Sequence, residues 1–145
     1  MNNISVGGKT TVWMLQRAKE TLHIGIDYCF IYGGSNDMYN SKITIESAVK
    51  NIQKIVNICN TKGVKPVVIT GFDPLICINT PENPNYKFKY SKFQNELIKK
   101  IVGGRVINTR VITKSDCWDG LCHMAPSGHK KIGNCVIKEM KFKTY

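Results

Sequence analysis

One stretch decides the fold: residues 28–37, with the sequence Tyr-Cys-Phe-Ile-Tyr-Gly-Gly-Ser-Asn-Asp. Its first half completes a near-continuous apolar, β-branched and aromatic run from Ile24 to Tyr32. Such a run is typical of a strand that is buried on both faces, as in a parallel sheet. The strand leads directly into two glycines and then Asn36 and Asp37. Because open α/β sheets carry out chemistry at the carboxyl ends of their strands, we expect Asn36 to lie at a functional edge.

Helical patterns lie on both sides of this stretch. The spacing of apolar residues predicts helices at Thr10–Leu22, Ile45–Cys59 and Tyr90–Ile101, and a last helix that opens near Pro126. Thr44 is placed as the N-cap of the second helix, and Gly63 lies just past its end.

Short apolar runs separate these helices and predict three further strands. They are Ile4–Val6, Pro66–Gly71 and Val106–Ile112. The segment from Asp73 to Asn85 is rich in proline and asparagine, which favours a long loop. Alternation of strand and helix predicts an α/β fold: a flavodoxin-like, doubly wound parallel sheet with helices on both faces, in three layers. With 145 residues and 42% hydrophobic composition, the chain fits one domain, residues 1–145.

Nothing in the sequence suggests a membrane protein or an exported one. Residues 1–8 lack a basic start followed by an apolar stretch, and no run approaches the roughly 18 apolar residues of a membrane span. Six cysteines are scattered without the spacing of a disulfide framework or of a paired Cys-x-x-Cys zinc site. We therefore expect reduced thiols and, for the sequence as written, a cytoplasmic protein.

The net charge of +11 comes almost wholly from lysine, since only Arg17, Arg105 and Arg110 are arginines. Proteins that recognise nucleic-acid sequence usually rely on arginine. We interpret the charge as a solvated lysine surface and do not predict a nucleic-acid partner. A basic nucleic-acid-binding α/β domain stays open as an alternative, for which binding should weaken steeply with salt.

A second informative stretch is Asp119–His129, with the sequence Asp-Gly-Leu-Cys-His-Met-Ala-Pro-Ser-Gly-His. It puts an acid and a histidine on the loop that enters the last predicted helix. An acid that orients an imidazole, together with donors at the end of another strand, is the arrangement that acyl transfer requires.

Both stretches resemble sequence blocks of the SGNH (GDSL-like) hydrolases, a family of esterases and lipases, and the resemblance runs through nearly the whole chain. Asn3–Thr11 is similar to a block in which a glycine before a helix, here Gly8, donates its backbone N–H to the oxyanion. Asn36 matches the asparagine whose side chain donates to the same oxygen. By the same resemblance His123 is the general base and Asp119 the acid that orients it.

Two departures from the family pattern matter. Three residues separate Asp119 from His123 where the family has two, so Asp116 remains an alternative acid, although we favour Asp119. The Gly-Asp-Ser block that supplies the nucleophile is absent from residues 1–145, and no serine present follows a comparable strand-to-turn signature. We therefore expect a fold without the family's first strand, no nucleophile in this chain, and feeble ester hydrolysis or none.

In the family, the missing strand lies between the strand that ends at Val6 and the strand that ends at Tyr32. Its absence leaves backbone donors and acceptors unpaired. Three explanations stay open: translation starts upstream, another chain or a split gene supplies the strand, or the N-terminal residues have shifted inward to give a noncatalytic relic.

The resemblance implies a carboxylic ester hydrolase with a Ser-His-Asp mechanism and no cofactor or metal. Its substrate is a small acyl ester, an acetylated carbohydrate or a lipid ester. A noncatalytic carbohydrate- or acyl-binding module is an alternative. A zinc site is another, but the spacing of its five candidates fits no standard site: Cys117, Cys122, His123, His129 and Cys135.

Overall fold

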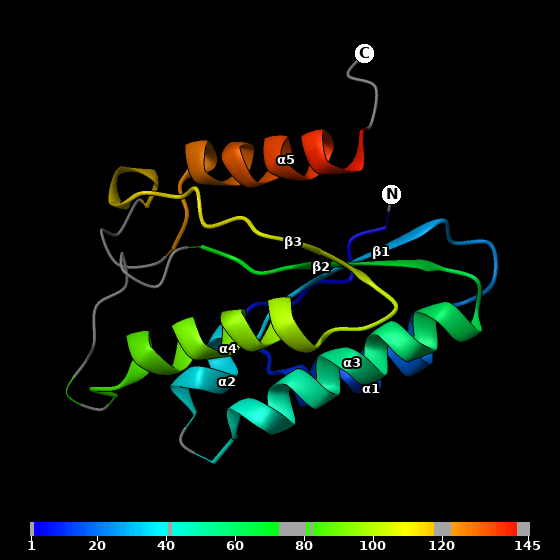
Figure 1. Cartoon of the computed structure of the whole chain (residues 1–145), viewed down its shortest axis with the longest axis horizontal. Coiled ribbons are helices and arrows are strands. Elements are labelled where there is room, and N and C mark those ends of the chain that lie inside the picture. The colour runs from blue at the N-terminus through cyan, green and yellow to red at the C-terminus, as the bar shows by residue number, and fades with distance from the viewer. Residues whose placement is uncertain (1, 41, 73–80, 82, 118–122, 142–145) are drawn as a thin grey trace.

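A computed structural model of the chain contains one sheet of three parallel strands with helices on both sides (Figure 1). It describes every residue except 1, 41, 73–80, 82, 118–122 and 142–145. The strands are β1 (Tyr28–Tyr32), β2 (Lys65–Ile69) and β3 (Arg105–Ile107), and they follow this order across the sheet. Phe30 lies opposite Val67, which lies opposite Arg105.

The helices form two layers. Four helices lie below the sheet in Figure 1: α1 (Thr11–Thr21), α2 (Ser35–Tyr39), α3 (Ile45–Thr61) and α4 (Tyr86–Lys100). Above it lies α5 (Pro126–Met140), which follows the short 3-10 helix η2 (Lys114–Asp116). The predicted three-layer α/β fold is confirmed. No helix in the described part of the chain is long and apolar enough to cross a membrane.

Several predicted helix ends are confirmed in detail. The Thr44 side chain accepts a hydrogen bond from the Ser47 N–H at 3.1 Å, so it caps α3. Gly63, just past that helix, adopts a φ of +72°, a left-handed conformation that favours glycine. The last helix begins at Pro126, where the fixed φ of proline suits the first helical position.

The prediction of a strand at Ile4–Val6 is wrong. Residues 2–6 have no regular secondary structure, because no strand lies beside them to pair with. Two other strands are shorter than predicted. β1 begins only at Tyr28, since Gly25 turns the chain with a φ of +99°, and β3 ends at Ile107. The short helix α2 was not predicted.

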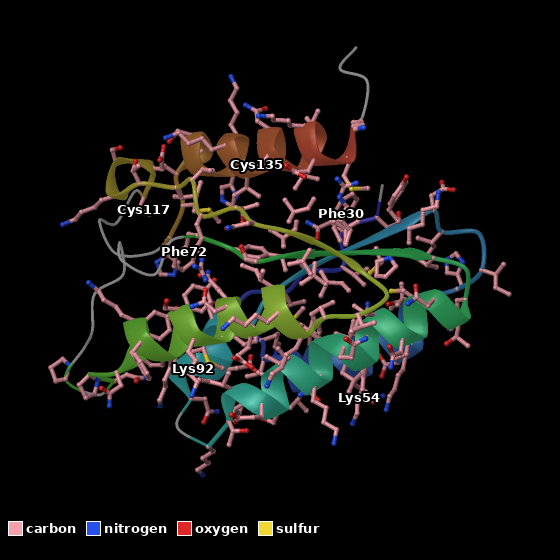
Figure 2. All side chains as sticks on the ribbon, viewed as in Figure 1. Phe30, Lys54, Phe72, Lys92, Cys117 and Cys135 are labelled. Atoms are coloured by element: carbon pink, nitrogen blue, oxygen red, sulfur yellow. The ribbon has the colours of Figure 1, made fainter. Side chains whose placement is uncertain are left out.

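The core lies between the sheet and the lower helices. Its fully buried side chains include Ile52 and Val56 of α3 and Tyr90, Phe93 and Leu97 of α4. On the opposite face α5 contacts β3, whereas β1 is less well covered. Figure 2 shows Phe30 on this α5 side, and Phe30 and Tyr32 are 40% and 42% exposed.

Candidate active site

Gly8 lies in a turn that precedes α1. Its φ of +73° is in the left-handed region that glycine adopts without strain. No other group lies within 4 Å of the position where a Cβ would stand, so the turn is open to solvent. Because α1 begins at Thr11, Gly8 precedes the helix by three residues instead of starting it.

Asn36 is the second residue of α2, directly after the Gly33-Gly34 turn that ends β1. Its Nδ2 donates a hydrogen bond to the Lys9 carbonyl oxygen at 3.1 Å. A primary amide carries two N–H bonds, so this contact uses one and leaves the other to donate elsewhere. The bond holds the Asn36 side chain beside the residue that follows Gly8.

Asp37 fixes the relative position of these two segments. Its buried carboxylate accepts hydrogen bonds from the Thr11 backbone N–H, at 2.9 and 3.1 Å to its two oxygens, and from the Thr11 hydroxyl. Thr11 Oγ1 in turn accepts from Asn51 Nδ2 at 3.1 Å. A carboxylate at the N-terminus of α1 satisfies an otherwise unpaired N–H and is favoured by the helix dipole.

The sequence interpretation assigned no role to Asp37. The signal was present, because an aspartate next to the predicted site asparagine can accept from the N–H groups at the Thr-Thr start of the first predicted helix. Their pairing links residues far apart in the chain, so local patterns alone did not reveal it.

The Gly33-Gly34 turn is required by packing. Gly34 has a φ of +98°, and a Cβ there would stand 2.3 Å from the ring of Phe93. A side chain at Gly34 would therefore collide with a fully buried aromatic ring and strain the backbone. This close contact between the turn and α4 therefore fixes where α2, which carries Asn36, begins after β1.

A cavity of about 330 Å³, here called the edge cavity, lies between residues 4–9, α1 and β1. Its lining includes Ile4 and Val6 from the N-terminal segment, Ala18 from α1 and Ile31 from β1. Gly8 and Asn36 also line it, so the structure brings these two predicted site residues to one cavity. His123 is not among its lining residues.

His123 is exposed and lies on the loop between η2 and α5. The two ends of that loop are joined by a bridge between Cys117 and Met124 and by a 2.7 Å hydrogen bond from Ala125 N to the Asp116 carbonyl. His123 is therefore next to a fixed point at the start of α5. Asp119, the predicted acid, lies outside the described residues.

The Asp116 carboxylate, the alternative acid, is occupied by structural bonds. Its Oδ2 accepts from Lys131 Nζ at 2.7 Å and from the N–H and hydroxyl of Thr113 at 2.9 and 2.8 Å. The bond from Lys131, followed by those from Thr113, holds the pKa of Asp116 well below its usual range. This carboxylate therefore stays ionised while it caps η2 and holds α5.

A further polar network holds the carboxyl ends of β2 and β3. Gln94 Nε2 donates to the carbonyl oxygens of Thr70 and Phe72 at 2.9 and 2.7 Å, and its Oε1 accepts from Arg110 Nε at 2.8 Å. Thr109 N donates to Thr70 Oγ1 at 3.1 Å. No described residue of this network lines the edge cavity.

Metal chemistry receives no support from the described residues. Four cysteines there are thiols: Cys29, Cys59, Cys117 and Cys135. No group of three or more His, Cys, Asp or Glu side chains in the described ranges lies close enough to hold a metal ion. Cys122, one of the five zinc candidates, falls outside those ranges.

The fold and the position of the cavity define the class of protein. A parallel, doubly wound sheet with a turn glycine and an asparagine at the end of β1 is an α/β protein with a site at the carboxyl edge of the sheet. The family follows from sequence comparison. The model of the GDSL-like lipase/acylhydrolase family matches residues 1–136, so the chain belongs to that family. A comparison with curated protein sequences finds no match.

Solved structures share the fold. A GDSL-like lipase from Bacteroides thetaiotaomicron VPI-5482 has 14% identity and a TM-score of 0.76, over 92% of this chain and 72% of that chain. An acetylxylan esterase from Geobacillus stearothermophilus has 14% identity and a TM-score of 0.66, over 94% of this chain and 69% of that chain. At such identities the likeness shows the fold alone.

Proposed function

We propose that residues 1–145 form the larger part of a serine-dependent carboxylic ester hydrolase. One observation carries the proposal: Gly8 and Asn36 line the same cavity at the end of β1, and the Asn36 amide is bonded to the residue after Gly8. Two N–H donors from different segments at one cavity can serve as an oxyanion hole. Membership of the acylhydrolase family supports this chemistry.

In the proposed mechanism a serine hydroxyl attacks the ester carbonyl carbon while the His123 imidazole takes its proton. The carbonyl oxygen becomes an oxyanion that accepts hydrogen bonds from Gly8 N–H and Asn36 Nδ2–H. When the tetrahedral intermediate breaks down, the alcohol leaves with the proton from the imidazolium. Water then attacks the acyl-serine in the same way and releases the acid. Each oxyanion donor lowers the barrier by about 3 kcal/mol.

The acid that orients His123 is Asp119 in this proposal. The structural bonds of Asp116 to Lys131 and Thr113 support the choice, because a carboxylate that left them would uncap η2 and release α5. Asp119 follows Asp116 by three residues and precedes His123 on the same loop.

The serine is supplied by polypeptide other than residues 1–145. Loss of a serine nucleophile lowers turnover by about a million-fold in a related mechanism, so the 145-residue chain alone is expected to be nearly inactive. Small acyl esters, acetylated carbohydrates and lipid esters are the substrate classes. The acetylxylan esterase among the similar structures makes acetylated carbohydrate the first natural class to test.

The test compares residues 1–145 with a fusion in which a strand-forming segment ending in Gly-Asp-Ser precedes Met1 through a flexible linker. Hydrolysis of p-nitrophenyl acetate and acetylated xylooligosaccharide is measured. Activity is expected only in the fusion, and it should disappear when the added serine or His123 becomes alanine. A fusion that is folded by circular dichroism but inactive, or activity of residues 1–145 that survives His123→Ala, would contradict the proposal.

A noncatalytic binding module is the second candidate, and the edge cavity of about 330 Å³ favours it, since a pocket of that size accepts a small acyl ligand. Calorimetry would support this alternative if an acylated sugar binds to the chain and still binds after His123→Ala. Neither the chain nor the fusion should then cleave the sugar ester.

A further inference from the structure

We propose that Cys29 and Cys59 form a site of reversible oxidation, in which hydrogen peroxide oxidises Cys29 and Cys59 then closes an internal disulfide between β1 and α3. This inference goes beyond the proposed ester hydrolysis and uses neither its oxyanion donors nor His123. Both cysteines are free thiols, so the pair starts in its reduced form.

The first argument is the position of the two residues in the backbone. Cys29 is the second residue of β1, and Cys59 lies in the last turn of α3. The Cys59 carbonyl oxygen accepts a hydrogen bond from Val64 N–H at 2.9 Å, and β2 begins at the next residue, Lys65. Cys29 lies opposite Pro66 of that strand. The short connection from α3 to β2 therefore brings the end of α3 to the start of β1, on the right of Figure 1.

The second argument is the contact between the two side chains. The Cys59 thiol is hydrogen-bonded to the Cys29 sulfur. Cys59 is 0% exposed within the core, and Cys29 packs against that core. A disulfide requires two sulfurs that face each other and can approach to about 2 Å. Because these sulfurs are already in contact, the bond can form without opening the fold.

The third argument is that the two thiols are chemically different. The hydrogen bond from the Cys59 thiol lowers the pKa of Cys29, although burial acts in the opposite direction. The same bond, together with burial, raises the pKa of Cys59, so that thiol keeps its proton. The thiolate is the form of cysteine that attacks other molecules. Cys29 is therefore the attacking thiolate and Cys59 the resolving thiol.

The fourth argument is access for the oxidant. Cys29 is half-buried and lines the edge cavity, whereas Cys59 does not line it. The cavity volume of about 330 Å³ equals that of about ten liquid water molecules. Hydrogen peroxide is only slightly larger than water, so it fits. The oxidant therefore reaches Cys29 and not Cys59.

One peroxide molecule is consumed for each pair of thiols. The Cys29 thiolate attacks one peroxide oxygen, the O–O bond breaks, and the departing hydroxide takes up the proton that Cys29 had released, which gives water and a sulfenic acid. The Cys59 sulfur then attacks the Cys29 sulfur, the S–O bond breaks, and the hydroxide leaves as water with the proton from Cys59. The two thiols lose two electrons and the peroxide gains them. A dithiol such as dithiothreitol reverses the oxidation.

The test treats the whole folded chain with hydrogen peroxide in small molar excess, blocks the remaining thiols with iodoacetamide, and maps tryptic peptides without reduction. Trypsin cleaves after lysines on both sides of each cysteine, which gives peptides 20–42 and 55–62 with one cysteine each. Mass spectrometry should find these two peptides joined, with the loss of two hydrogen atoms, and dithiothreitol should separate them. The oxidised chain should also melt at least about 5 °C higher, because a cross-link restricts the unfolded chain.

Three variants assign the roles. In Cys59→Ala the sulfenic acid has no resolving partner, so its labelling by dimedone should rise at least about tenfold above wild type. The pH midpoint for alkylation of Cys29 should also rise in this variant, because the donor to the thiolate is lost. In Cys29→Ala, Cys59 should stay reduced. Cys135→Ala makes the same change at a half-buried cysteine on α5 and should leave the disulfide unchanged.

Three results would overturn the proposal: no joined peptides after oxidation of the folded wild type, equal dimedone labelling of wild type and Cys59→Ala, or loss of the disulfide in Cys135→Ala. Thermal unfolding checks that each variant is folded. The peptide map of the wild type needs no variant, so it decides the proposal even where Cys59→Ala does not fold. Ester hydrolysis enters none of these measurements, so the thiol pair and the proposed function fail separately.

Discussion

The β2–β3 side of the sheet and its β1 edge differ in how their polar groups and apolar surfaces are covered. At the carboxyl ends of β2 and β3, Gln94 and Thr109 form buried hydrogen bonds within the described chain. Beside β1 there is an apolar cavity instead, and Phe30 on its rim keeps 40% exposure. The polar groups on the β2–β3 side bond to one another, whereas β1 ends the sheet in the described part of the chain and lies beside a cavity.

This difference separates the residues that stabilise the fold from those expected to act in catalysis. Phe93 and Gln94 follow each other on α4, are both fully buried, and hold the turn after β1 and the end of β2. Asn36 and Gly8 line the less complete side. Substitutions of Phe93 and Gln94 should lower stability, and substitutions of Gly8 and Asn36 should lower catalysis.

The largest expected effect is that of Phe93→Ala. This ring is 0% exposed and packs against the Gly34 turn, so its removal leaves a cavity in the core. The free energy of unfolding should fall by about 3–5 kcal/mol, measured by urea denaturation. A loss below about 1 kcal/mol would mean that α4 is not packed tightly against this turn.

The next prediction compares two amide side chains, of which Gln94 is buried and Asn36 is exposed. Gln94→Leu keeps the volume but leaves two carbonyl oxygens and the Arg110 Nε–H without their partner, so stability should fall by about 2–3 kcal/mol. Asn36→Leu alters an exposed side chain and should change stability by less than about 0.5 kcal/mol.

The variant Asn36→Leu also tests the catalytic role of this side chain. In the serine-bearing fusion, Asn36→Leu should lower kcat by about 100- to 1,000-fold through loss of an oxyanion donor. Equal losses of stability in both variants, or an unaffected kcat in Asn36→Leu, would remove the distinction between the sides.

Local sequence patterns were sufficient to predict several helices and their ends. The 3.6-residue spacing predicted α3, whose Thr44 cap and Gly63 end are confirmed, and Pro126 marked the first residue of α5. These features depend on residues close in the chain, so propensity and capping rules describe them.

The incomplete side shows why the rest was not predictable. Ile4–Val6 has the composition of a strand, yet a strand forms only when another lies beside it, and that is a property of the assembled sheet. The pairing of Asp37 with Thr11 likewise joins distant segments. Asn36 and Gly8 were predicted through the family pattern, and the structure brings them to one cavity without testing their roles.

A third prediction concerns pH and the β3 side. Because the folded-state pKa of Asp116 is depressed by Lys131 and Thr113, its stabilising contribution is complete above the ordinary value of 3.8 and is lost as pH falls toward the folded-state pKa. Between about pH 6 and pH 3 the wild type should lose more stability than Asp116→Asn. Parallel urea midpoints for the two proteins across this range would rule out the ion pair with Lys131.

A small effect in the chain alone should come from Phe30→Ala, since this ring is 40% exposed and its removal exposes little new apolar surface. We expect a loss below about 1 kcal/mol. Urea denaturation of wild type and Phe30→Ala measures this difference. A loss above about 2 kcal/mol would mean that the Phe30 ring is packed against other side chains and is not at an exposed edge of the sheet.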